Sequence, residues 1–145
     1  MISQNNKRAG SAAAAAERRS HSNINDKEVC TMTPYIKNLA HETVVSLAAQ
    51  VSAQNGQIVS KTLAQNRAVS LTLFAFSQGE EISTHDSTGD AMVTVLEGTG
   101  QFTVDGTVYT CHAGESLVMP ATKPHSVYAP EAFKMLLTVI FPLED

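Results

Sequence analysis

The sequence has few of the features on which several large classes of protein depend. Its 145 residues include no tryptophan, only two cysteines (Cys30 and Cys111), and no apolar run near the roughly 18–20 residues that span a bilayer. Two cysteines are too few for a disulfide framework, so we expect reduced thiols, a cytoplasmic location and no membrane partner. The chain also lacks a G-x-S-x-G motif, a P-loop and a recognisable Cys–His spacing, the usual signs of nucleophilic and nucleotide-binding sites.

Basic residues are scarce in most of the chain. Residues 1–31 carry a formal charge of +2, whereas residues 32–145 carry −6. Proteins that bind nucleic acids present clustered Lys and Arg, because the phosphate backbone supplies much of the affinity. We therefore expect no nucleic-acid partner.

The composition of the chain changes near residue 31. Residues 1–31 are rich in Asn, Ser, Arg and Ala, and they show no periodic apolar face. This predicts a disordered, low-complexity tail. The remaining residues, 32–145, are enough to bury one hydrophobic core and are predicted to form a single domain.

Local patterns predict a mostly β-structure for this domain. Apolar spacing from Pro34 to about Val51 predicts a short amphipathic helix, and Asn55-Gly56 then predicts a turn. Strand-like runs follow with no helical pattern between them. They cover residues 57–63, 68–76, 91–97, 101–104, 107–112, 116–119, 123–129 and 133–141. Short strands at this spacing predict an all-β sandwich or barrel.

Two segments each place one histidine beside a turn and a short apolar strand. His85 lies in residues 79–98 and His125 in residues 114–129. Histidines from separate strands are what a metal site at a barrel mouth requires. Because alternate side chains share one face of a strand, the same pattern predicts a small-molecule cavity. Its predicted ligand-binding residues are His85, Ser87, Ala91, Val93, His125 and Val127.

The first segment resembles a motif of the cupin superfamily, in particular its small, single-domain, conserved-barrel (RmlC-like) members. In that motif a glycine is followed after five residues by His-x-His, then by a glutamate and a final glycine. The spacing is matched here by Gly79, His85, Ser87, Ala91 and Gly98. Ser87 and Ala91 stand where the family has histidine and glutamate.

The second segment resembles the other cupin motif, which has a glycine, Pro-x-Gly, a histidine and an asparagine. Its spacing is matched by Gly114, Pro120, Thr122, His125 and Ala129. The resemblance covers about residues 55–141. It implies a double-stranded β-helix, or jelly roll, and a homodimer.

The resemblance also implies a metal held by three histidines and a glutamate. His85 and His125 match two of these ligands, whereas Ala91 cannot coordinate a metal and Ser87 is a weak neutral ligand. Tight binding of Mn, Fe, Ni or Zn normally takes three protein ligands, so the set is incomplete. Asp90 is a candidate substitute if Gly89 allows a bulge, whereas Asp86 directly follows His85 and is expected to face solvent.

Three functions are consistent with these residues. The first is binding of a small molecule around His85 and His125, with a weak or absent metal. The second is a metal-dependent oxygenase or isomerase that uses the two histidines, and the third is a non-catalytic dimeric scaffold. Protonated histidines would also bind an anion. The sequence leaves open whether the protein is an enzyme.

Overall fold

The computed structural model describes residues 2–3 and 34–143. The chain divides into two compact units, one made of Met1–Gln4 and Ser46–Asp145 and the other of Asn5–Val45. The tail predicted for residues 1–31 lies outside the described residues, apart from Ile2 and Ser3. These two residues form a short strand, β1 (Ile2–Ser3), that belongs to the first unit.

The amphipathic helix predicted from Pro34 to about Val51 is not present. The described residues contain only one helical turn, the 3₁₀ helix η1 (Ala48–Gln50). Asn38 and Glu42 have φ angles of 62° and 54°, which are left-handed and cannot continue a right-handed helix. Thr43-Val44-Val45 follows them, and β-branched side chains lower helix propensity. Apolar spacing alone was therefore a poor guide in this stretch.

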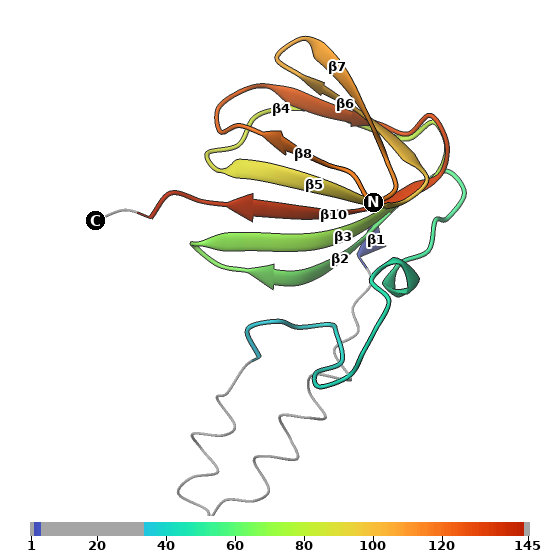
Figure 1. Ribbon diagram of the computed structural model, residues 1–145, viewed down its shortest axis with the longest axis vertical. Coiled ribbons are helices and arrows are strands. Elements are labelled where there is room, and N and C mark those ends of the chain that lie inside the picture. Colours follow the sequence, from blue (N-terminus) through green and yellow to red (C-terminus); the bar gives the residue numbers. More distant parts are fainter. Residues whose placement is uncertain (1, 4–33, 144–145) are drawn as a thin grey trace, which may run out of the picture. The chain divides into compact units, whose positions relative to one another are not determined.

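The first unit is an all-β barrel made of two sheets, as the jelly-roll prediction requires (Figure 1). One sheet has six strands in the order β1-β2-β3-β10-β5-β8, and the other has four in the order β4-β9-β6-β7. The strands after β1 are β2 (Ile58–Gln65), β3 (Val69–Phe76), β4 (Glu81–His85), β5 (Asp90–Glu97), β6 (Thr99–Val104), β7 (Thr107–His112), β8 (Ser116–Met119), β9 (His125–Tyr128) and β10 (Phe133–Ile140). All neighbours pair antiparallel except β1 and β2, which are parallel.

Every strand predicted from the sequence is present, but β4 was missed. The predicted strands leave residues 77–90, which contain β4, unassigned. β4 lies at the edge of its sheet and pairs only with β9. Most of its side chains are exposed, so it lacks the apolar alternation by which a half-buried strand is detected.

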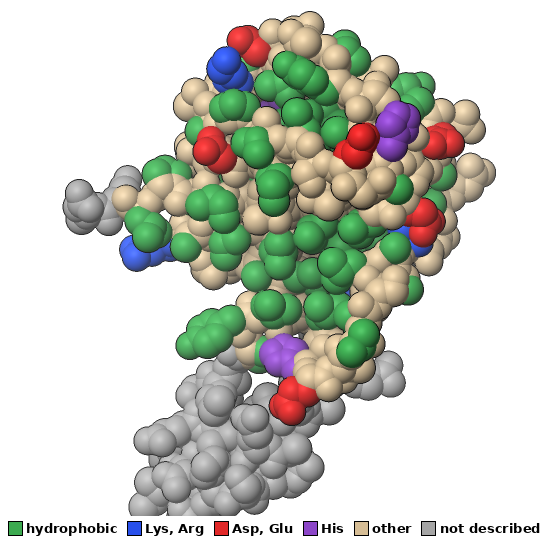
Figure 2. Space-filling view, viewed as in Figure 1, with side chains coloured by type: hydrophobic (Ala, Val, Ile, Leu, Met, Phe, Trp, Pro, Cys, Tyr) green, Lys and Arg blue, Asp and Glu red, His purple; other side chains and the backbone are tan. Residues whose placement is uncertain are grey.

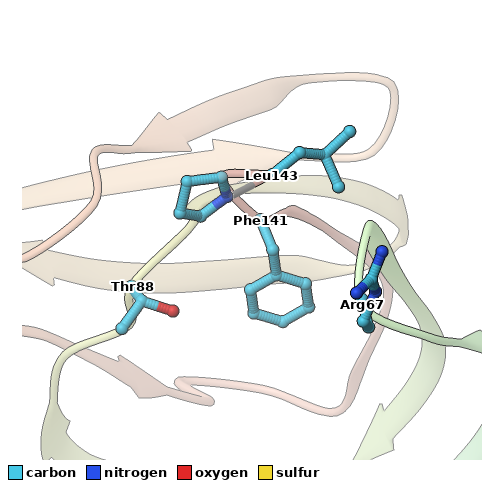
Figure 3. Close-up of a pocket in the computed structure, with 5 residues that line it drawn as sticks. Arg67, Thr88, Phe141 and Leu143 are labelled. Carbon is cyan, nitrogen blue, oxygen red and sulfur yellow. The ribbon is translucent and has the colours of Figure 1, made fainter. Parts of the chain in front are cut away.

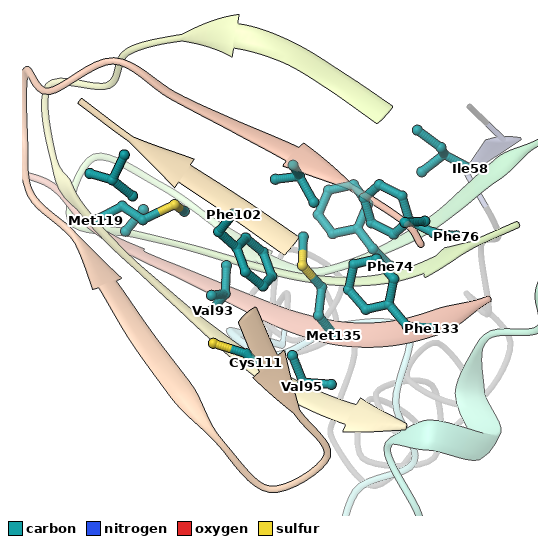
Figure 4. Close-up of a cluster of buried hydrophobic side chains, with 14 of the residues drawn as sticks. Ile58, Phe74, Phe76, Val93, Val95, Phe102, Cys111, Met119, Phe133 and Met135 are labelled. Atoms are coloured by element: carbon teal, nitrogen blue, oxygen red, sulfur yellow. The ribbon is translucent and has the colours of Figure 1, made fainter. Parts of the chain in front are cut away.

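Four phenylalanines fill one end of the barrel. Phe76 of β3 stacks on Phe133 of β10, with ring centroids 4.6 Å apart, and Phe74 lies beside them. Phe102, which comes from the opposite sheet, meets Phe133 edge-on at 6.2 Å. Figure 4 shows Phe74, Phe76 and Phe133 together toward one end of the core and Met119 toward the other, with Phe102 between them. Aromatic pairs in such geometries stabilise a core by about 0.5–1.5 kcal/mol beyond their area burial.

Two lysines fix the η1 turn over the outer face of the six-stranded sheet. Lys61 of β2 donates a hydrogen bond to the Oε1 atom of Gln50 at 3.1 Å. Lys134 of β10 donates to the carbonyl oxygen of Ala48 at 2.7 Å. Burial lowers the pKa of Lys61, which is the expected cost of taking an ammonium group out of water.

Gly89, in the turn between β4 and β5, allows a close approach to the end of β10. A Cβ atom built at Gly89 would overlap the carbonyl oxygen of Ile140 and lie 3.1 Å from the Phe141 ring. The obstacle is mainly backbone, so it cannot be relieved by a change of side-chain rotamer. This turn therefore depends on glycine for space, although its φ angle is not left-handed.

We predict that Gly89→Ala lowers the free energy of unfolding by about 1–3 kcal/mol, the usual cost of overpacking. Urea denaturation of the parent and the variant would measure the loss. Gly56→Ala is the control, because Gly56 has a left-handed φ of 72° but no atom within 4 Å of the added Cβ. A loss at Gly89 no larger than the loss at Gly56 would contradict the close approach.

Candidate functional site

Pairing of β4 with β9 brings the two predicted histidines together. His85 and His125 are direct partners in the antiparallel register. Their ring centroids are 4.4 Å apart and the rings are inclined at 66°. His125 is only 4% exposed, whereas His85 lies at the exposed end of its strand. The two segments singled out in the sequence thus form one site.

An irregularity in β4 aims His85 at this site. Ile82 pairs with Val127 and His85 pairs with His125, so three steps along β4 match two steps along β9. In a regular strand, Ile82 and His85 would point to opposite faces. The extra residue of a β-bulge restores them to the same face, a device common beside functional sites.

Hydrogen bonds to the backbone define which ring nitrogen of each histidine is free. The Nδ1 atom of His85 lies 2.8 Å from the carbonyl oxygen of Ser83, and that of His125 lies 3.1 Å from the carbonyl oxygen of Lys123. A carbonyl oxygen only accepts, so each Nδ1 must carry a hydrogen and donate it. In the neutral ring, Nε2 is then left with its lone pair, available to a ligand.

The two histidines line a cavity of about 260 Å³ inside the barrel. All six residues predicted to bind a ligand contribute to its wall, which draws on both sheets. The lining consists of Ile82, His85, Asp86, Ser87, Ala91, Val93, Met119, His125, Val127, Met135, Leu137 and Val139. The structure therefore brings the six together, and their contact with a ligand remains a prediction.

Three wall residues from β10 were not assigned to the cavity from the sequence. Met135, Leu137 and Val139 alternate along the strand, so their pattern placed them on one common face. The sequence did not assign this face to the cavity, because alternation does not identify which face of a strand is inside. Pairing of β10 with both β3 and β5 decides the matter.

The two aspartates near His85 lie in different surroundings. Asp86 is exposed, as predicted, although β4 ends at His85 and strand alternation does not apply beyond it. The side chain of Asp86 also lines the cavity. Asp90 lies outside the cavity lining, and its Oδ1 accepts a hydrogen bond of 2.8 Å from the backbone N–H of Ala121. Asp90 therefore acts as a link between two turns.

The residues present do not fit the four-ligand metal site that the cupin resemblance implies. Within residues 2–3 and 34–143, no three His, Cys, Asp or Glu side chains lie close enough together to hold a metal ion. Ala91 has no donor atom, and the Ser87 hydroxyl accepts a hydrogen bond from the N–H of Gly89 at 3.1 Å. Among the described residues that line the cavity, the metal-binding nitrogens are those of His85 and His125.

A strained residue holds the rim of the cavity. Thr122 has a φ of 69°, a left-handed conformation that is costly for a β-branched residue. Its backbone N–H donates a 2.8 Å hydrogen bond to the carbonyl oxygen of Ser87. This bond connects the turn before β9 to the turn before β5, next to both histidines. Thr122 stands where the second motif has glycine, the residue best suited to such a φ.

Other reactive or charged groups lie apart from this cavity. Cys111 is buried, and burial, with a smaller effect of Glu115, raises the pKa of its thiol. This thiol is therefore poorly suited to nucleophilic chemistry.

A second hollow of about 370 Å³ is lined by Arg67, Thr88, Phe141, Pro142 and Leu143 (Figure 3). No helix among the described residues has the length and hydrophobicity needed to cross a bilayer.

Comparison with known proteins agrees with this architecture. The family described as "Cupin domain" matches residues 72–141. A conserved protein of unknown function from Streptococcus pyogenes is 42% identical, covering 79% of this chain and 99% of its own, with a TM-score of 0.76.

Two further solved structures are similar. A cupin superfamily protein from Desulfitobacterium hafniense is 31% identical over 75% of this chain and 100% of its own, with a TM-score of 0.72. An RmlC-like cupin from Desulfovibrio desulfuricans is 28% identical over 71% of this chain and 100% of its own, with a TM-score of 0.61. Among curated proteins no match is found.

Proposed function

This chain belongs to the cupin superfamily, and on that premise we propose that it binds a small organic molecule in its barrel cavity. His85 and His125 are the principal polar contacts. The observation that carries the proposal is the pair of imidazoles, 4.4 Å apart, on the wall of an otherwise mostly apolar cavity. A concave apolar site with a few convergent polar groups is the usual form of a small-molecule pocket.

The balance of contacts limits the affinity. Burial of about 100 Å² of apolar ligand surface contributes roughly 2.5 kcal/mol, which is less than the cost of immobilising a free molecule. Hydrogen bonds to the two histidines must supply much of the remainder. We therefore expect binding to depend strongly on these side chains. The scaffold alternative predicts instead that their removal leaves ligand affinity unchanged.

We predict that His125→Phe, which retains a buried ring, weakens binding of small fragments in the cavity by at least about tenfold. Methyl NMR signals of Met119 and Met135 would report binding, because both side chains line the cavity. His112→Phe is the matched control, since His112 is exposed on β7 and outside the cavity lining. Equal affinities in the parent and both variants would argue for a scaffold.

A second candidate function, a metal-dependent enzyme of the oxygenase or isomerase type, draws support from the ring orientation of the histidines. Metal-binding histidines typically donate the other ring N–H to a carbonyl or carboxylate, as His85 and His125 do here. Against it stands the lack of a carboxylate at Ala91. Mn, Fe, Ni or Zn would have to complete its coordination with water or substrate.

Restoring the family's ligands tests this alternative. Ala91 is 1% exposed and lines the cavity, so Ser87→His with Ala91→Glu would place an imidazole and a carboxylate beside the existing pair. We predict near one metal per chain in this double variant and far less in the parent, measured by plasma mass spectrometry. The control carries Ser87→His with Met92→Glu, because Met92 lies on the opposite face of β5. Near-stoichiometric metal in the parent, lost on His85→Ala or His125→Ala, would favour the enzyme.

A homodimer is also part of the proposal. The outer face of the six-stranded sheet exposes Met92 (40%), Val118 (54%) and Ile140 (56%), and the first two are cross-strand partners. Figure 2 shows hydrophobic side chains gathered over the middle of the face on which β3, β5 and β10 run. Such a patch is a common feature of protein–protein interfaces.

We predict a dimer in sedimentation velocity at micromolar concentration, and a monomer when Met92→Lys and Val118→Lys are combined, because two buried ammonium groups would oppose association. Val108→Lys is the control, since Val108 is 55% exposed but lies on β7 of the other sheet. A parent protein that sediments as a monomer would remove the dimer from the proposal.

A further inference from the structure

The polar atoms that the cavity offers are nearly all hydrogen-bond acceptors. In their neutral forms both histidines use Nδ1–H on backbone carbonyls, so only the Nε2 lone pairs remain. Asp86 adds an ionised carboxylate, which only accepts. Ser87 can also donate through its hydroxyl hydrogen. A ligand that satisfies this set must therefore donate hydrogen bonds itself.

Asp86 is the one carboxylate in the cavity lining. Apart from the two histidines, the lining contains no basic side chain among the described residues. Lys123, two residues before His125, lies 3.9 Å from the carboxylate of Asp105 and does not line the cavity. Within the described residues, neither of the two ion pairs involves Asp86. The mouth of the cavity is thus suited to a positive charge.

The remaining wall is apolar and the space is small. Valine, leucine, isoleucine and methionine side chains make up most of the lining, and the volume of about 260 Å³ lies below the range usual for drug-sized ligands. The occupant therefore has a compact apolar body with room for only a short polar head.

We propose that the ligand is a small primary amine, bound as its ammonium ion with its apolar body inside the barrel. The ammonium group has three N–H donors and no acceptor, which complements the Nε2 atoms of His85 and His125. Asp86 supplies the opposite charge, and hydrogen bonds between ionised partners are stronger than neutral ones. This inference rests on the proposed small-molecule function and names its ligand class.

Three probes of the same size separate charge from shape. Benzylamine is a cation at pH 7.5, benzyl alcohol is a neutral donor, and benzoate is an anion that only accepts. We expect benzylamine to bind about three- to tenfold more tightly than benzyl alcohol, because exposure of Asp86 screens part of its attraction. Benzoate should bind at least about tenfold more weakly than benzylamine, since Asp86 repels it. Chemical-shift titration of the Met119 and Met135 methyl groups would give the three affinities.

A substitution at Asp86 tests the source of the preference. Asp86→Asn keeps the size of the side chain and removes its charge, so benzylamine should fall to the affinity of benzyl alcohol while the alcohol itself is unchanged. Glu81→Gln is the matched control, because Glu81 is an exposed carboxylate on β4, the strand that ends just before Asp86, and it does not line the cavity. It should leave all three affinities as they are.

The outcomes distinguish the two levels of the proposal. If benzyl alcohol or benzoate binds in the cavity as tightly as benzylamine, the amine class is wrong and the small-molecule function stands. The same holds if Asp86→Asn leaves the preference for benzylamine intact. If none of the three probes shifts the Met119 or Met135 signals, the small-molecule function fails and the amine class falls with it.

Discussion

The packing of four phenylalanines at one end of the barrel is the contact on which the remaining structure depends. Phe74, Phe76 and Phe133 come from the six-stranded sheet and Phe102 from the four-stranded one, so their rings join the two layers. Phe76 and Phe133 are also direct partners in the register of β3 with β10. A one-residue slip would turn these side chains out of the core, which makes the register costly to change.

The same packing explains why the cavity lies at the other end. Strands that begin or end in phenylalanine at the filled end carry smaller side chains farther along, such as Val139 on β10. On β5, Ala91 and Val93 occupy the corresponding positions. Interiors are normally packed as densely as organic crystals, so space is left only where side chains are too short to meet. The filled end thus holds the two sheets together, and the unfilled end leaves the cavity.

Strand patterns in the sequence were enough to predict an all-β sandwich or barrel, and the cupin resemblance specified the jelly roll. Strand alternation, a rule that holds wherever strands are regular, grouped the six residues that line the cavity. The rule does not extend past the bulge and the end of β4. It placed Asp86 correctly at the solvent but did not reveal that Asp86 also lines the cavity. It also gave no indication of β4 itself, whose polar side chains carry no periodic signal. The helix predicted before Val51 failed because left-handed residues interrupt it, and φ angles of Asn and Glu are not evident from apolar spacing.

Loss of two metal ligands changes the chemistry of the site more than its shape. In the cupin pattern, three histidines and a glutamate surround a divalent cation, and the carboxylate offsets part of its charge. Here serine and alanine replace two ligands, while the two remaining imidazoles keep the Nδ1 bonds that leave their Nε2 lone pairs free. These Nε2 lone pairs carry partial negative charge, so they favour a positively charged or hydrogen-bond-donating partner even without a tightly bound metal. One carboxylate, Asp86, also lines the cavity, and its charge would be balanced by a monocation. The serine and alanine are thus consistent with the proposed occupant, an organic ammonium ion in place of the metal of the cupin pattern.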